Sequence, residues 1–238
     1  MVKILAVGNS FSEDATALLQ LLNPDLFVRN LYIGGCSLER HVDEFTLDNA
    51  AYSYEENGSD SLGHLITLKE ALLSEKWDYI TVQQESGRSG KIETYYPYLT
   101  MLLNYIRQFS DAEIVLHETW AYETGSTHPK FVDYNSSTAK MWAAIEKTYA
   151  EVAGRENLRV IPVGAFIAAL RRSPVFDQDR GGVSLTRDGF HLSLNYGRYA
   201  AALVWNGFFG GKYPEALKTY PSEPFKVIRE TYDKFLSR

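Results

Sequence analysis

The chain has 238 residues, of which 45% are hydrophobic and 23% are charged, and its formal net charge is −6. This length suits one α/β domain with a sizeable core, and the negative charge argues against nucleic acid or an anionic membrane surface as the main partner. The single cysteine, Cys36, excludes an intrachain disulfide and a cysteine-based metal cluster, so we expect a packed thiol. No apolar run approaches a membrane span and no signal peptide is visible, so we expect a cytoplasmic protein unless a leader was removed.

Residues 2–12 contain a short apolar run that stops at Gly8-Asn9-Ser10. Such a run is typical of a strand that is buried on both faces of a parallel sheet. Ser10 then lies at the carboxyl end of a strand, where open α/β sheets bind their ligands, and just ahead of a helix predicted over 15–22. Two interpretations stay open on these residues alone. Ser10 is a nucleophile, or Ser10 or Ser12 merely caps the helix.

The rest of the chain alternates predicted strands with predicted helices. The segment 41–63 is polar and tyrosine-bearing, and we expect a surface excursion there, with a small hairpin or a lid as options. The alternation predicts an α/β fold with a five-stranded parallel sheet covered by helices on both faces, in a single domain over 1–238. Strands are expected at 27–33, 77–82, 113–118 and 158–163, and helices at 65–73, 96–109, 136–153, 165–170, 194–208 and 224–236.

Asp188 stands three residues before His191 in a predicted loop that leads into a helix. At that spacing Asp188 can accept a hydrogen bond from one ring nitrogen of His191 while the other nitrogen faces Ser10. A carboxylate so placed fixes the tautomer of the histidine and stabilises the imidazolium that forms when it takes the serine proton. Taken singly, Asp188-Gly189 is also an ordinary turn, and His117 is the rival candidate for the base.

Together these motifs resemble the SGNH (GDSL) hydrolases. Gly8-Asn9-Ser10-Phe11-Ser12 resembles the Gly-Asp-Ser-Leu block, Gly35 falls where the second-block glycine stands, and Asp188-Gly189-Phe190-His191 matches the final Asp-x-x-His block. The resemblance implies a flavodoxin-like three-layer α/β/α sandwich and ester hydrolysis through an acyl-serine, with no metal and no organic cofactor. It makes Ser10 the nucleophile, His191 the general base and Asp188 its orienting acid.

The resemblance also implies an oxyanion hole, built from the backbone N–H groups of Ser10 and Gly35 and a side-chain amide of the third block. That block departs from the usual Gly-x-Asn-Asp, because here the strand runs into Gln83-Gln84-Glu85-Ser86. It is more similar to the Gln-Gly-Glu block of carbohydrate acetylesterases. We therefore expect the amide of Gln83, or else that of Gln84, to be the third donor.

The same resemblance suggests a small-molecule substrate, a short-chain (acetyl) ester on a carbohydrate. Trp120 and Tyr122 are expected to offer stacking surfaces for the sugar, with burial in the core as the alternative for Trp120. Two other functions stay open: a lipase or thioesterase for longer acyl chains, and a non-catalytic carbohydrate-binding protein that kept the fold. No glycine motif for dinucleotides or phosphates follows a strand, which argues against nucleotide binding. The sequence leaves the oligomeric state open.

Overall fold

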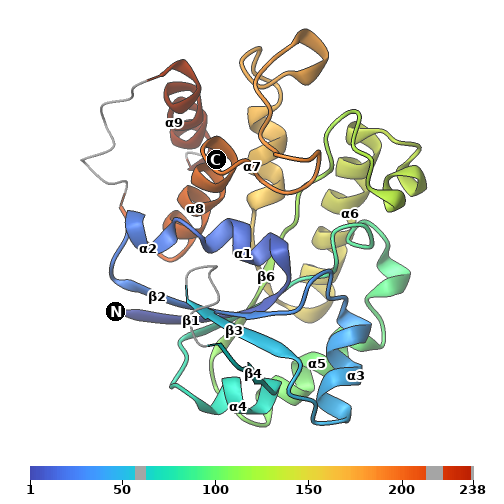
Figure 1. The fold of residues 1–238 in the computed structure, drawn as a ribbon, viewed down its shortest axis with the longest axis vertical. Coiled ribbons are helices and arrows are strands. Elements are labelled where there is room, and N and C mark those ends of the chain that lie inside the picture. The colour runs from blue at the N-terminus through green and yellow to red at the C-terminus, as the bar shows by residue number, and fades with distance from the viewer. Residues whose placement is uncertain (57–62, 213–221, 237–238) are drawn as a thin grey trace.

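One mixed sheet of seven strands carries helices on both faces (Figure 1). The computed structural model describes residues 1–56, 63–212 and 222–236. Across the sheet the strand order is β4-β3-β2-β1-β5-β6-β7. The strands are β1 (Val2–Gly8), β2 (Leu26–Tyr32), β3 (Tyr52–Glu56), β4 (Leu65–Ile66), β5 (Tyr79–Val82), β6 (Glu113–His117) and β7 (Arg159–Ile161).

The five strands β2-β1-β5-β6-β7 are all parallel, and they are the five that the alternation predicts. Their order is that of flavodoxin-like sheets, in which the chain reverses direction across the sheet between β1 and β5. The central strand β1 is covered on both faces, and Ile4 to Val7 are each no more than 1% exposed. Ser10 therefore follows the central strand at the switch point, where this class of sheet binds ligands.

Two further strands, β3 and β4, extend the sheet beyond β2 in antiparallel orientation, so the predicted count of five was too low. The expected surface excursion over 41–63 is wrong for its first part, because His41 and Tyr52 are fully buried. The option of a small hairpin in this segment agrees with the antiparallel pairing of β3 with β4. In β3 the rings of Tyr52 and Tyr54 belong to the core while Ser53 between them is partly exposed, as in a strand with one covered face, and Glu55 is buried as well. Residues 57–62 of that segment lie outside the described residues.

The helices form two layers, one over each face of the sheet (Figure 1). One group of helices packs together around α8 and consists of α1, α2, α7, α8 and α9. In a second group α3 packs on α4 and α5. The long helix α6 contacts β7 and α7. None of the helices in the described ranges combines the length and apolarity needed to cross a bilayer. The helices are α1 (Ser10–Thr16), α2 (Leu19–Leu22), α3 (Leu38–Thr46), α4 (Leu68–Leu73), α5 (Tyr98–Arg107), α6 (Thr138–Glu156), α7 (Val163–Leu170), α8 (Tyr196–Phe208) and α9 (Glu223–Leu236).

Capping side chains explain where two helices differ from their predicted bounds. The predicted helix over 15–22 is split into α1 and α2, and α1 already begins at Ser10 because the Asn9 side chain accepts the N–H of Phe11. The helix predicted over 65–73 begins at Leu68, because Thr67 forms a capping box with Glu70 and the two residues before it join β4. Both signals were present in the sequence as ordinary capping residues.

Glu118 follows β6 and is buried, and its carboxylate accepts the N–H of Ala165 at the start of α7 at 2.7 Å. Burial raises the pKa of Glu118 from 4.5 to about 7, against the effect of this hydrogen bond. Between pH 4.5 and 7, the Glu118 carboxyl is therefore protonated in the folded protein and ionised in the unfolded chain. The stability that Glu118 confers should be complete below that pH and should fall by up to about 3 kcal/mol as the pH rises to 7.

Urea unfolding of Glu118→Gln between pH 4.5 and 8 tests this linkage. The free energy of unfolding of the wild type relative to Glu118→Gln should decrease with pH across that interval. Glu93→Gln, at an exposed position, is the matched control and should differ from the wild type by a constant amount. A pH-independent difference for Glu118→Gln would contradict the raised pKa.

Candidate active site

Ser10, His191 and Asp188 lie in one chain of hydrogen bonds. His191 Nε2 is 2.9 Å from Ser10 Oγ, and His191 Nδ1 is 2.6 Å from Asp188 Oδ2. Asp188 Oδ1 accepts the backbone N–H groups of Phe190 at 3.1 Å and His191 at 2.7 Å. Partial burial opposes ionisation, but the hydrogen bonds from His191 and from these two backbone groups lower the pKa of Asp188. The carboxylate is thus ionised at neutral pH and can hold the imidazole in position.

Asp14, one turn after Ser10 in α1, holds the loop that carries His191. Its carboxylate is buried, and each of its oxygens lies 2.9 Å from Arg187 Nη1. Oδ1 also accepts from Arg198 Nε at 2.7 Å, and Oδ2 accepts the N–H of Leu192 at 2.8 Å. This carboxylate therefore joins α1, the loop that carries His191, and α8. Asp14 could not be identified from the sequence, because nothing in the chain order shows that Arg187 and Arg198 meet it.

Glu123 holds the same loop from its other side. Its buried carboxylate accepts the N–H of Leu185 at 2.9 Å and the hydroxyl of Thr186 at 2.7 Å, and it also accepts from the Ser184 hydroxyl. The backbone N–H of Glu123 donates to the carbonyl of Gly189 at 2.8 Å. These hydrogen bonds thus fix residues 184–189, the segment that leads to His191.

Asn9 is the centre of a buried polar network beside Ser10. Its Nδ2 donates to the carbonyl of Cys36 at 3.0 Å, and its Oδ1 accepts from Gln83 Nε2 at 2.7 Å. His117 Nδ1 lies 2.7 Å from Gln83 Oε1. Burial lowers the pKa of His117 to about 3, so the ring is neutral and Nδ1–H is the donor. His117 is therefore a partner of Gln83, and His191 is the histidine that contacts Ser10.

Three of the predicted oxyanion donors are the backbone N–H groups of Ser10 and Gly35 and the side-chain amide of Gln83. Among the hydrogen bonds of the described residues, the backbone N–H groups of Ser10 and Gly35 have no protein acceptor. Gly35 has a φ of +61°, and a Cβ at this position would meet nothing within 4 Å, so open space adjoins it. Gln83 uses one amide hydrogen on Asn9 and retains the other.

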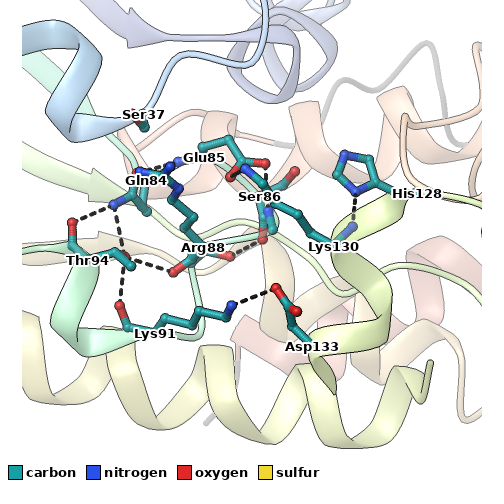
Figure 2. Close-up of polar contacts among 12 residues, drawn as sticks. Ser37, Gln84, Glu85, Ser86, Arg88, Lys91, Thr94, His128, Lys130 and Asp133 are labelled. Carbon is teal, nitrogen blue, oxygen red and sulfur yellow. Dashed lines mark hydrogen bonds and ion pairs between the residues drawn. The ribbon is translucent and has the colours of Figure 1, made fainter. Parts of the chain in front are cut away.

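The prediction that Gln84 can replace Gln83 as a donor is wrong. Gln84 Nε2 donates to the carbonyl of Thr94 at 2.9 Å and to its hydroxyl at 3.1 Å (Figure 2). Gln84 Oε1 accepts the N–H groups of Leu38 at 3.0 Å and Glu85 at 2.8 Å. A buried amide satisfies its hydrogen bonds with the nearest backbone groups, and here they leave no hydrogen for a substrate.

The prediction that Trp120 and Tyr122 stack on a sugar is also wrong, because both side chains are fully buried. Trp120 stacks on Phe11 with ring centroids 4.1 Å apart, and its Nε1 donates to the carbonyl of Phe190 at 2.7 Å. The Tyr122 ring lies against Phe190 at 5.7 Å. Both residues thus support Phe190, the neighbour of His191, from inside the core.

The expected packed thiol is confirmed, since Cys36 is 1% exposed and burial raises its pKa.

The sheet order and the helix layers give this chain the α/β fold that SGNH hydrolases also have. A solved structure of a candidate SGNH hydrolase from Slackia heliotrinireducens is similar to this chain, with a TM-score of 0.60, 24% identity and coverage of 88% of this chain and 99% of that one. More distantly, the fold is shared with a catalytic mutant of Axe2, an acetylxylan esterase from Geobacillus stearothermophilus, with a TM-score of 0.51 and 13% identity over 89% and 95% of the two chains.

The chain belongs to the family described as domain of unknown function DUF4886, whose profile matches residues 3–227. A crystal structure of a DUF4886 family protein from Bacteroides uniformis is 34% identical, covers 99% of this chain and 95% of its own, and has a TM-score of 0.85. A comparison with curated proteins finds no significant match.

Removing the charge of Asp14 should loosen the loop that carries His191. Asp14→Asn leaves two arginines without their buried carboxylate, which we expect to lower the free energy of unfolding by about 3 kcal/mol. Urea unfolding measures this loss, and hydrogen exchange should show faster exchange of residues 186–192. Asp111→Asn, at an exposed position, is the control and should stay within about 0.5 kcal/mol of the wild type. Wild-type stability and exchange in Asp14→Asn would refute the role assigned to this carboxylate.

Proposed function

We propose that this protein is a serine esterase that hydrolyses a carboxylic ester through an acyl-serine intermediate. The observation that carries the proposal is the pair of hydrogen bonds that join Ser10 Oγ to His191 and His191 to Asp188, at 2.9 and 2.6 Å. A neutral imidazole that donates Nδ1–H to an ionised carboxylate has its lone pair on Nε2, facing the serine hydroxyl. This is the arrangement that a general base needs.

In the proposed reaction His191 Nε2 takes the proton of Ser10 as Oγ attacks the ester carbonyl carbon. The imidazolium, held by Asp188, then gives this proton to the alkoxide oxygen as the bond between that oxygen and the acyl carbon breaks. A water molecule enters, loses a proton to the same nitrogen and attacks the acyl-serine. The carboxylic acid leaves and Ser10 regains its proton. The scheme requires no metal and no organic cofactor.

The charge on the tetrahedral intermediate needs donors on the opposite side of the ester from His191. The N–H groups of Ser10 and Gly35 suit this role because neither is used by a protein acceptor among the described residues. Gln83 supplies the third donor with its remaining amide hydrogen. The network through Asn9 and His117 orients that amide before substrate binds.

For the substrate we propose a short-chain acyl ester, with acetyl as the acyl group and a carbohydrate as the alcohol. Two findings support this choice: the third block resembles that of carbohydrate acetylesterases, and acetylxylan esterases are among the proteins with a similar fold. The burial of Trp120 and Tyr122 means that other side chains must contact the sugar. A series of nitrophenyl esters of increasing chain length separates this function from a lipase or thioesterase.

Hydrolysis of p-nitrophenyl acetate tests the proposed chemistry. The wild type should turn over the ester, and Ser10→Ala and His191→Ala should each lose at least about 1000-fold in kcat, because each removes an essential part of one unit. A fluorophosphonate should add its mass to Ser10 in the wild type and leave Ser10→Ala unlabelled.

Ser110→Ala is a matched control for Ser10→Ala, and circular dichroism should show that all variants fold. Equal, slow background hydrolysis by the wild type and the folded variants, together with no labelling of Ser10, would overturn the esterase proposal. The non-catalytic carbohydrate-binding function would then be favoured.

Gly35→Ala tests the proposed oxyanion hole. Gly35 and Gly210 both have positive φ, +61° and +77°, and both adjoin open space, so alanine strains the backbone at each by about 1 kcal/mol. Only the strain at Gly35 displaces a proposed donor. We therefore expect kcat for p-nitrophenyl acetate to fall by about 10-fold or more in Gly35→Ala and to stay within about 2-fold in Gly210→Ala. Equal activities of the two variants would exclude the Gly35 N–H from the hole.

A further inference from the structure

His128 lies beside the proposed active site and has no part in the reaction described above. It immediately precedes a short 3-10 helix, Pro129–Tyr134. Its ring centroid lies 4.8 Å from that of Phe190, and the Phe190 ring lies 4.2 Å from His191. A continuous row of three rings therefore leads from the proposed base to His128.

The hydrogen bonds of His128 define which nitrogen carries the proton. Nδ1 accepts the backbone N–H of Lys130 at 3.2 Å, as the dashed line in Figure 2 shows, so the proton of the neutral ring is on Nε2. Nε2–H has no acceptor among the described residues. Burial lowers the pKa of His128, and Lys130 and His191 lower it further against Glu85 and Asp188. At neutral pH the ring is therefore an uncharged donor with one free N–H.

The surroundings of His128 hold this donor in place. Tyr122 lies behind the ring at 4.6 Å, and its hydroxyl is 2.8 Å from Ser86 Oγ. Lys130, whose N–H binds the ring, is itself tied to Glu85 Oε2 through Nζ at 2.6 Å. Figure 2 shows these residues of the third block and of the 3-10 helix facing one another. A donor that its neighbours already hold in one orientation binds a ligand with little loss of side-chain entropy.

The position of His128 relative to His191 indicates which part of an ester it meets. His191 must reach the oxygen of the leaving alcohol to return the proton, so the alcohol lies on the side of His191. The proposed oxyanion donors, Ser10 and Gly35, lie on the other side of the ester carbonyl. His128 contacts Phe190, which contacts His191, so His128 lies on the same side of the site as His191 and hence on the side of the alcohol.

We propose that His128 Nε2–H binds a hydroxyl or ring oxygen of the alcohol half of the substrate, and that this contact selects acetylated saccharides over simple acetate esters. The inference rests on the proposed esterase function. A neutral N–H is suited to an uncharged sugar oxygen, and the Phe190 ring beside it provides an apolar surface for the C–H groups of a sugar.

Two acetate esters with different alcohols test this role. His128→Phe keeps an aromatic ring against Phe190 and removes the donor, and His128→Gln returns an N–H donor. For an acetylated xylooligosaccharide with free hydroxyls, we expect kcat/KM to fall by about 10- to 100-fold in His128→Phe, mainly through KM, and to recover in part in His128→Gln. For p-nitrophenyl acetate, whose alcohol has no sugar oxygens, both variants should stay within about 2-fold of the wild type.

The p-nitrophenyl acetate rate also shows that each variant is folded and has an intact nucleophile. An unchanged preference between the two esters in His128→Phe would overturn the inference, as would a wild type that hydrolyses p-nitrophenyl acetate and not the saccharide ester. A wild type that hydrolyses neither ester would refute the esterase proposal itself, and the role of His128 with it.

Discussion

The contact between Ser10 and His191 depends on the buried carboxylate of Asp14. The two residues are 181 positions apart in the chain, and Asp14 is attached to the first of them through α1 while it holds the loop of the second. Two arginines and a backbone N–H surround this carboxylate, which offsets the cost of removing it from water. A buried charge must keep all its hydrogen bonds, so it allows few geometries. The hydrogen bonds of Asp14 therefore also set the distance between Ser10 and His191.

A second buried network, made of neutral groups, fixes the strand ends on the other side of Ser10. His117, kept neutral by burial, donates to Gln83, which donates to Asn9, which in turn holds the loop at Cys36. These hydrogen bonds connect the ends of β6, β5, β1 and β2 in their order across the sheet. The strand ends are thereby fixed at the switch point. Side chains that resemble catalytic groups in the sequence, His117 among them, here orient other residues.

Patterns that depend on neighbours in the chain were the ones that could be predicted. The apolar runs of the parallel strands identified the five-stranded core, and the first and last motifs identified Ser10, Asp188 and His191, which do meet. The antiparallel strands β3 and β4 were not counted in the sheet, although a small hairpin was one option for this segment, because tyrosine and serine alternate there in a segment that is polar in composition. The role of Gln84 was wrongly predicted for a similar reason. The sequence around a glutamine at a strand end does not show whether its amide faces a substrate or, as here, Thr94.

The sequence by itself therefore determined the class of fold and the three residues of the Ser10–His191–Asp188 chain. The class of fold follows from the periodicity of the strands, which is a local property of the polypeptide. The three residues were identified by the resemblance of the first and last motifs to those of the SGNH hydrolases. Only the tertiary structure decided that Trp120 is buried behind Phe190 and that Asp14 holds the loop that carries His191. It also decided that His128 stands near this loop, with an Nε2–H that has no acceptor in the described part of the chain. Each of these depends on which side chains meet across the sheet and between loops. Such contacts are set by packing between segments distant in the chain, and no local pattern records them.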